Sequence, residues 1–316
     1  MKVVDIKSDL RVNLAPGHIK GLHLSNPVIA ASGTFGYGME YAELVDIQSL
    51  GAIICKGTTL NARKGNPQPR IVETDCGLLN SVGLENIGVD TVVREKAPVW
   101  ADWRVPVIVN VSGETIDDYV GVVGKLEGVP GISGIELNIS CPNVSRGGIE
   151  FGVNPELAAE VTSAARAATG LPLMVKLSPN VSDIGEIAMA VEKAGAHAIS
   201  LINTVRGISI NVTKGRPSLG NVTGGLSGPA IRPIAIYMVY EVARLVHIPV
   251  VGCGGVVTAS DALEFIMAGA TAVQVGTANF TDPCVSLAVL GGMEDFMRKK
   301  GIKNITELIG CANQFS

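Results

Sequence analysis

Residues 134–143 read Gly134-Ile-Glu-Leu-Asn138-Ile-Ser-Cys141-Pro142-Asn143, a short apolar run that ends on polar residues, a cysteine and a proline. The apolar residues predict a β-strand, and Pro142 ends it because proline has no N–H for strand pairing. Cys141 therefore lies where a strand gives way to a loop. A thiol that only packs would more often lie within the strand, so Cys141 is a candidate for chemistry.

Seven other apolar runs resemble this one, and they alternate with stretches of helical periodicity. The predicted strands begin near residues 28, 52, 106, 134, 172, 196, 249 and 272, and the predicted helices cover 116–127, 155–168, 183–194, 231–246, 259–268 and 284–300. Continuously apolar strands are typical of parallel strands buried on both faces. Eight strand–helix units predict an α/β fold, a closed (β/α)8 TIM barrel, with an open doubly wound sheet as the competing architecture.

The spacing of the strands locates additions to this barrel. The second and third strands begin 54 residues apart (52 to 106) and the sixth and seventh 53 apart (196 to 249), so we expect insertions after strands 2 and 6. Residues 1–26 precede the barrel and predict a hairpin that closes its bottom. We expect a single domain over residues 1–316.

Composition excludes several classes of protein. Charged residues make up only 17% of the chain and the formal net charge is −4, which argues against a nucleic-acid or anionic-membrane surface. No two cysteines lie within three residues of each other, so no local metal or iron–sulfur motif is predicted. A charged N-terminus without a long apolar run predicts neither a signal peptide nor a membrane span. We therefore expect a cytoplasmic protein.

Every predicted strand ends on glycine or on polar residues, at the edge where a barrel carries its active site. These ends are Ser32-Gly33, Lys56-Gly57, Asn110, Asn138 to Cys141, Lys176, Asn203-Thr204, Gly254-Gly255 and Gly276-Thr277. The two glycine-containing pairs after strands 7 and 8 predict a phosphate site built from backbone N–H groups. Either pair alone is equally compatible with an ordinary turn.

The lysines and asparagines among these ends suggest the kind of ligand. Lys56 and Lys176 could pair with an anion, stabilise negative charge on a ring, or form a Schiff base, and the alternative is a side chain that reaches solvent. Asn110, Asn138 and Asn203 each offer a donor and an acceptor, which suits a planar ligand with C=O and N–H edges.

No histidine stands at the predicted strand ends, so a Cys–His nucleophile pair is not predicted for Cys141. A lone thiol, with an ordinary pKa of about 8.5, can still act as a base toward a carbon acid. We interpret Cys55, Cys76, Cys253 and Cys284 as buried structural thiols.

Five motifs together resemble the dihydroorotate dehydrogenases over essentially the whole chain. They are Ser32-Gly33-Thr34-Phe35-Gly36, Lys56-Gly57-Thr58, Gly65-Asn66-Pro67-x-Pro69-Arg70, Asn80-Ser81-Val82-Gly83-Leu84 and Asn138-x-Ser140-Cys141-Pro142-Asn143. The resemblance implies a barrel that carries FMN and oxidises dihydroorotate to orotate in the synthesis of pyrimidines and UMP.

The resemblance also implies roles for individual residues. The FMN phosphate and ribityl chain would be held by Gly228, Gly254, Gly255, Gly276 and Thr277, and the isoalloxazine lined by Ser32, Lys56, Gly57, Asn110, Asn138, Lys176 and Ile202. Substrate would contact Lys56, Asn80, Ser81, Val82, Gly83, Leu84, Asn138, Asn203 and Thr204. Cys141 would remove the proton from C5 of dihydroorotate while C6 passes hydride to the flavin, and Lys176 would stabilise negative charge on the reduced flavin.

Residues 203–207 and 224–228 look most like the NAD-linked class 1B enzymes. In that class a partner subunit carries FAD and a [2Fe–2S] cluster, which implies a heterotetramer of two catalytic and two electron-transfer chains built on a homodimer of this chain. Alternatives within the resemblance are a fumarate-linked class 1A enzyme and a dihydropyrimidine dehydrogenase component. On the residues alone, a Schiff-base aldolase using Lys176 and a non-catalytic flavin scaffold stay open.

Two segments carry further expectations. The loop from Pro142 to Gly152 is expected to cover Cys141 during turnover. The second insertion, Val205 to Ser227, is expected to shape the site or to contact a partner.

Overall fold

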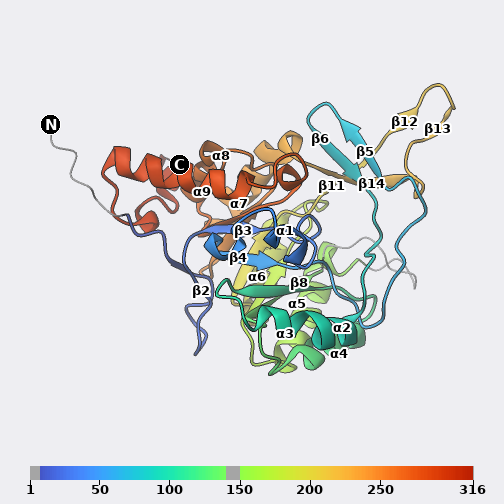
Figure 1. Cartoon of the computed structure of the whole chain (residues 1–316), viewed down its shortest axis with the longest axis horizontal. Helices are drawn as coiled ribbons and strands as arrows, with labels where there is room; N and C mark the ends of the chain where they lie inside the picture. Colours follow the sequence, from blue (N-terminus) through green and yellow to red (C-terminus); the bar gives the residue numbers. More distant parts are fainter. Residues whose placement is uncertain (1–7, 140–149, 316) are drawn as a thin grey trace.

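The computed structural model describes residues 8–139 and 150–315, and the centre of this part is a closed barrel of eight parallel strands (Figure 1). In chain order these are β3 (Val28–Ala30), β4 (Ala52–Ile54), β7 (Val107–Val111), β8 (Gly134–Asn138), β9 (Leu173–Lys176), β10 (Ala198–Leu201), β15 (Val250–Cys253) and β16 (Ala272–Val275). Each strand pairs with its neighbours in chain order, and β16 closes the ring against β3. The predicted TIM barrel is confirmed, and the open sheet was wrong.

Helices surround the barrel at the predicted places. They are α4 (Ile116–Leu126), α5 (Pro155–Ala167), α6 (Ile184–Lys193), α7 (Arg232–Ala243), α8 (Ala259–Ala268) and α9 (Val285–Lys300). Thr115 and Thr258 begin α4 and α8 with capping boxes, in which Asp118 and Asp261 return the hydrogen bond to the cap. These caps fix where each helix starts relative to the strand end before it.

A helical segment between the first insertion and β7 escaped the sequence analysis. It consists of α2 (Val89–Thr91), a π-helical turn (Val92–Lys96) and α3 (Ala97–Trp100), whose second residue is Pro98. The wider turn and the proline break the regular period on which a helix prediction depends. The remaining short elements are α1 (Met39–Ala42) and 3-10 turns at Ile47–Ser49, Phe151–Val153, Pro229–Ile231, Thr277–Phe280, Ile305–Glu307 and Cys311–Phe315.

The N-terminal hairpin is present as β1 (Val12–Asn13) paired antiparallel with β2 (His23–Leu24). His18 between them lies with its Nε2 2.8 Å from the carbonyl oxygen of Gly170, just before β9. The His18 ring also meets the ring of His197, just before β10, edge to face at 5.0 Å. The hairpin therefore lies at the amino ends of the strands.

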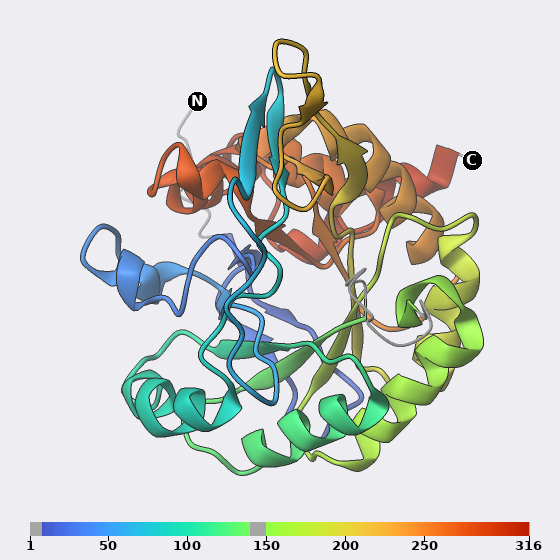
Figure 2. The same ribbon diagram turned by 90° about the vertical axis from the view of Figure 1, so that its right-hand side faces the viewer.

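The two predicted insertions are confirmed, and they join each other. The first contributes β5 (Ile71–Thr74) and β6 (Gly77–Asn80), and the second contributes β11 (Val205–Ile208), β12 (Ile210–Asn211), β13 (Arg216–Pro217) and β14 (Thr223–Ser227). Strands β11, β14, β6 and β5 form one antiparallel sheet in that order, called here the insertion sheet. Figures 1 and 2 both show the two insertions side by side.

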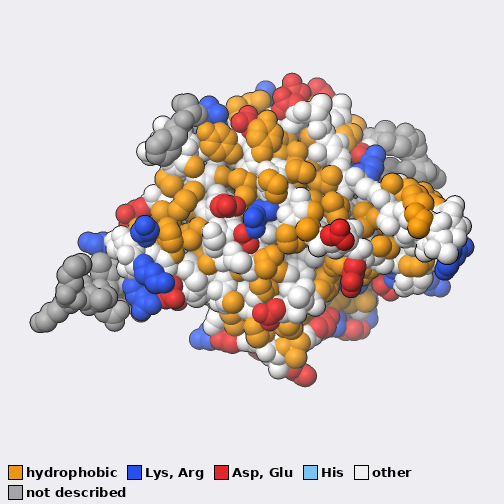
Figure 3. All heavy atoms as spheres, turned by 90° about the horizontal axis from the view of Figure 1, so that it is seen from above, with side chains coloured by type: hydrophobic (Ala, Val, Ile, Leu, Met, Phe, Trp, Pro, Cys, Tyr) orange, Lys and Arg blue, Asp and Glu red, His pale blue; other side chains and the backbone are white. Residues whose placement is uncertain are grey.

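Figure 3 shows how charged side chains are distributed on one face of the molecule. On the face seen from above, Lys and Arg side chains are interspersed with Asp and Glu among hydrophobic ones (Figure 3). Among the described residues, no helix is both long and apolar enough to cross a membrane, and no three potential metal ligands gather.

Candidate active site

A cavity of about 1530 Å³ lies at the carboxyl ends of the barrel strands, bounded also by the insertion sheet. Every predicted site residue within the described ranges lines it, and these residues come from elements far apart in the chain. They are Ser32, Lys56, Gly57, Asn80, Ser81, Val82, Gly83, Leu84, Asn110, Asn138, Lys176, Ile202, Asn203, Thr204, Gly228, Gly254, Gly255, Gly276 and Thr277. Cys141 lies outside the described residues, three positions after Asn138, the last residue of β8. The proposed covering loop is mostly outside them too.

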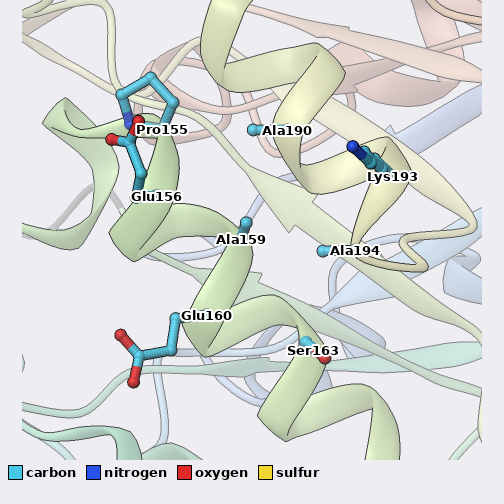
Figure 4. Close-up of a pocket in the computed structure, with 8 residues that line it drawn as sticks. All are labelled: Pro155, Glu156, Ala159, Glu160, Ser163, Ala190, Lys193 and Ala194. Atoms are coloured by element: carbon cyan, nitrogen blue, oxygen red, sulfur yellow. The ribbon is translucent and has the colours of Figure 1, made fainter.

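A second hollow, of about 510 Å³, lies between α5 and α6 in the outer layer (Figure 4). It is open, and alanines supply much of its lining, with Glu156, Glu160 and Lys193 at its sides. None of the predicted site residues lies there. The larger cavity is therefore the candidate active site.

One end of the cavity is formed by glycine backbone. Gly255 has φ +76°, and a Cβ there would lie 2.8 Å from the carbonyl oxygen of Gly228. Gly228 has φ +92°, and its Cβ would lie 2.8 Å from the Cα of Gly77. At both positions the positive φ angle and the short distance from a Cβ to neighbouring backbone atoms exclude a side chain. The backbone itself therefore forms this part of the cavity wall.

The same end presents backbone donors. Among the residues that the structure describes, no group accepts a hydrogen bond from the N–H of Gly254, Gly255, Gly276 or Thr277. A phosphate group offers several strong acceptors and suits such a cluster of N–H groups. This end of the cavity therefore fits a phosphate-bearing ligand.

Another part of the cavity wall is formed by amide side chains. Asn138 donates from Nδ2 to Oδ1 of Asn110 at 3.4 Å, and Asn203 donates to Oδ1 of Asn138 at the same distance. The N–H of Thr204 donates to Oδ1 of Asn203 at 2.8 Å. The hydroxyl of the buried Tyr119 donates to the carbonyl of Asn138 at 2.8 Å and so fixes the end of β8. The three predicted asparagines thus form one connected row.

Beneath this row lies a buried carboxylate. Glu136 on β8 has no exposed surface, and it accepts from Asn110 Nδ2 at 2.6 Å, from Ser200 Oγ at 2.8 Å and from Gln274 Nε2 at 2.7 Å. Gln274 in turn accepts from Lys176 Nζ at 3.0 Å. The predicted lysine and the amide row are therefore linked through one acidic residue.

Lys176 is only 4% exposed, so it does not reach solvent. Burial alone would lower its pKa, but nearby Cys253, 3.7 Å from Nζ, and Glu136 raise the pKa above its ordinary value. Burial raises the pKa of the Cys253 thiol. An ammonium held in this way is a fixed positive charge, whereas a Schiff-base lysine must present a neutral amine.

Lys56 differs from Lys176 because it is partly exposed within the cavity. Its backbone N–H donates to the carbonyl of Gly36 at 2.8 Å, which anchors the turn after β4. In the described part of the chain its ammonium forms no ion pair. Lys56 is therefore available to an anionic group of a ligand.

The insertion sheet completes the cavity. Asn80 on β6 donates from Nδ2 to the carbonyl of Gly225 on β14 at 3.2 Å. A Cβ on Gly225 would lie 2.0 Å from Oγ1 of Thr204, so this glycine leaves room for that threonine. Leu84 has a left-handed backbone, with φ +55°, beside Gly57. The segment from Asn80 to Leu84 therefore faces the ends of barrel strands.

Glu136 and Gln274 were not among the residues predicted from the sequence. The available signal was a charged or amide residue in the middle of a strand that is otherwise apolar, since such a residue must find partners inside the barrel. The interpretation of four cysteines as buried was partly wrong. Cys55 is buried, and burial raises its pKa to about 12, whereas Cys76 and Cys284 are exposed and Cys253 lines the cavity.

Comparisons with known proteins agree with this geometry. A family model described as dihydroorotate dehydrogenase matches residues 15–297. Two relatives named "Dihydroorotate dehydrogenase B (NAD(+)), catalytic subunit" are each 52% identical to this chain. The match to the relative from Geotalea uraniireducens spans 305 residues and covers 96% of this chain and 98% of the relative. The match to the relative from Desulforamulus reducens spans 304 residues and covers 96% of this chain and 100% of the relative.

The fold is also similar to a solved structure of DHODH from Eimeria tenella in complex with ferulenol. The TM-score is 0.81 at 22% identity, and the match covers 98% of this chain and 90% of that one. At that identity the likeness concerns the fold, and the family follows from the matches along the sequence. This chain belongs to the dihydroorotate dehydrogenase family.

Proposed function

We propose that this chain is the catalytic subunit of an NAD-linked dihydroorotate dehydrogenase, which oxidises dihydroorotate to orotate in pyrimidine synthesis. The observation that carries the proposal is one cavity whose wall combines glycine backbone with a row of amide side chains and two lysines. Half the sequence is shared with relatives that are named for this activity. The family is flavin-dependent, and the cavity has to accept both a flavin and a substrate.

The residues present fit FMN. Gly228, Gly254, Gly255, Gly276 and Thr277 would hold its phosphate and ribityl chain, because their end of the cavity offers unpaired backbone N–H groups and no side chains at the strained glycines. Ser32, Lys56, Gly57, Asn110, Asn138, Lys176 and Ile202 would surround its ring system. When bound, FMN supplies the acceptor for the hydride that leaves the substrate.

The chain's own side chains would orient the substrate. Dihydroorotate carries a carboxylate together with ring C=O and N–H groups. Lys56 would pair with the carboxylate, and Asn138 and Asn203, with Thr204 and the segment from Asn80 to Leu84, would bind the ring edges. Holding the ring flat in this way sets the reacting carbon in place.

Cys141 would act as the base that removes the proton from C5 of the substrate. Its place directly after β8 puts it in the sequence next to the amide row, and no histidine lines the cavity among the described residues. The buried ammonium of Lys176 would stabilise negative charge that develops as the substrate is oxidised.

We infer that NAD+ is reached through a second subunit. The relatives' names give both NAD(+) and a catalytic subunit. The partner would carry FAD and a [2Fe–2S] cluster, with two copies of each chain in a heterotetramer.

The first test mixes the purified chain, loaded with FMN, with dihydroorotate under anaerobic conditions. We expect the flavin absorbance to bleach, because the half-reaction needs no partner. A flavin that stays oxidised with dihydroorotate but bleaches with dihydrouracil would contradict the proposed substrate. Fumarate that reoxidises the bleached chain in multiple turnovers, without a partner subunit, would contradict the NAD-linked class.

A further inference from the structure

The buried carboxylate of Glu136 is not explained by the assigned roles. Glu136 does not line the cavity, but two of its hydrogen-bond donors, Asn110 and Gln274, lead to residues that do. Gln274 also accepts a hydrogen bond from Lys176, and among the described residues it is the amide that joins Lys176 to Glu136. A buried charge is costly unless its partners repay the loss of water. The arrangement therefore calls for a function beyond packing.

A carboxylate differs from an amide because it only accepts hydrogen bonds. Asn110 lies 2.6 Å from Glu136 and must turn its NH2 group toward it, so its oxygen faces the other way, toward Nδ2 of Asn138. Asn138 must then turn its oxygen toward Asn203. The direction of each amide follows from the one before it.

The other branch from Glu136 works in the same way. Gln274 donates its NH2 group to the carboxylate, which leaves its oxygen to accept from Lys176 at 3.0 Å. In the reverse orientation an NH2 group would face an ammonium, and two donors would meet in a buried site. The carboxylate thus sets the environment of Lys176 as well as that of the asparagines.

We propose that Glu136 is a positioning residue, whose carboxylate fixes the donor and acceptor directions of the amides around the ligand and supplies the counter-charge to Lys176. This inference rests on the proposed function. If Glu136 has this role, a residue that does not itself line the cavity determines which hydrogen-bond donors and acceptors the cavity presents to a pyrimidine ring.

The variant Glu136→Gln has the same shape but replaces one acceptor by an NH2 donor. If the donor faces Asn110, that amide must flip, and the flip passes along the row to the N–H of Thr204, which cannot reverse. If it faces Gln274, the flipped amide brings NH2 toward Lys176. Either outcome disturbs groups that line the cavity.

The experiment compares FMN-loaded wild type, Glu136→Gln and Ser200→Ala. The Ser200 hydroxyl donates to the same carboxylate at 2.8 Å but does not connect it to an amide. Removing this hydroxyl therefore leaves the charge of Glu136 and the orientation of the amides unchanged. Orotate affinity is measured from the flavin absorbance, and the flavin midpoint potential by anaerobic redox titration. We expect Glu136→Gln to bind orotate at least about tenfold more weakly and to raise the midpoint potential, with Ser200→Ala close to wild type in both.

Three results would overturn the inference. They are a Glu136→Gln variant that matches wild type, one that loses orotate affinity with an unchanged potential, and a Ser200→Ala variant as impaired as Glu136→Gln. A wild type that binds neither FMN nor orotate would instead overturn the proposed function.

A second measurement does not depend on whether the variant folds. Neutron diffraction from deuterated wild-type crystals locates the deuterium atoms on Asn110 and Gln274. We expect both ND2 groups to face an ionised Glu136. A deuterium on the carboxylate, or either amide oxygen facing it, would contradict the inference.

Discussion

The barrel end of the cavity and the insertion sheet that faces it present polar groups in different ways. On the barrel side, Asn110 and Lys176 are almost fully buried and connected through Glu136. On the insertion side, β5 and β11 are half exposed, and the sheet holds together by pairing strands from distant parts of the chain. The barrel supplies buried charges and amide groups of fixed orientation, whereas the insertion sheet supplies the shape of the cavity wall.

This difference separates two kinds of mutational effect. Changes on the barrel side alter charge or proton transfer in a site that cannot rearrange, because its groups have no water to replace a lost partner. Changes in the insertion sheet would displace side chains that we propose bind substrate. We therefore expect the first kind to reduce the chemical step, and the second to raise KM.

The largest effect is expected for Cys141→Ala. Removal of a general base typically costs about 10²–10⁴-fold, so reduction of the flavin by dihydroorotate should fall by that range while orotate still binds. Stopped-flow absorbance measures the rate, and in wild type we expect it to rise with pH as the thiol ionises. A variant that reduces its flavin at the wild-type rate would remove Cys141 from its assigned role.

Lys176→Met should follow, with loss of the buried positive charge. We expect flavin reduction to slow by roughly 10²-fold, because a fixed charge in a dry site stabilises developing negative charge strongly. The matched control is Lys193→Met, which removes a lysine of α6 beside the outer hollow and not in the cavity. Equal rates for the two variants in the same stopped-flow assay would show that the charge at the barrel end has no part in the chemistry.

A smaller effect is expected for Gly225→Ala in the insertion sheet. The added methyl group would meet Thr204 at 2.0 Å and push it from its place, so KM for dihydroorotate should rise about tenfold with kcat nearly unchanged. Gly291→Ala in α9, where a Cβ meets nothing within 4 Å, is the control. Steady-state kinetics separate the two constants. A fall in kcat at constant KM would break the distinction drawn between the two regions.

The smallest effect concerns the amino end of the barrel, far from the cavity. Burial, together with Arg166 and His18, lowers the pKa of His197 to about 4, and its neutral Nδ1 accepts from the N–H of Leu173 at 3.0 Å. Because the unfolded chain takes up this proton first, His197 contributes stability above about pH 6.5 that is lost as the pH falls toward 4.

We test this with His197→Asn, which keeps an acceptor that does not titrate. Wild type should lose about 1 kcal/mol more of its unfolding free energy than the variant between pH 7 and pH 5, a modest figure because the ring is half exposed. Urea unfolding at both pH values measures the difference. Identical losses in the two proteins would leave His197 without a part in the pH dependence.

The barrel could be predicted from the sequence because its strands are buried on both faces. In the run from Gly134 to Asn138 only Glu136 interrupts the apolar residues before the polar end at Asn138, and the polar ends follow from where each run stops. The grouping of Lys176 with Asn110 and Asn138 came from that logic alone. What the sequence could not show was that Glu136, within the same strand, connects them.

The insertion sheet could not be predicted in this way. Strand β14 reads Thr223-Gly-Gly-Leu-Ser227, which has neither apolar alternation nor β-branched residues in its interior. Its place depends on pairing with β6, which local periodicity does not report. The segment from Asn80 to Leu84 was found only through the resemblance to a known family.

The pairing of β6 with β14 also bears on the order of events in folding. The bond from Asn80 to Gly225 spans 145 residues, and such a contact forms only after the intervening chain has been synthesised and arranged. Six of the eight barrel strands and most of the second insertion precede Gly225 in the chain. A nascent chain therefore passes through a stage in which much of the barrel can assemble before the insertion sheet covers its end. At this stage the proposed flavin would have the widest entrance.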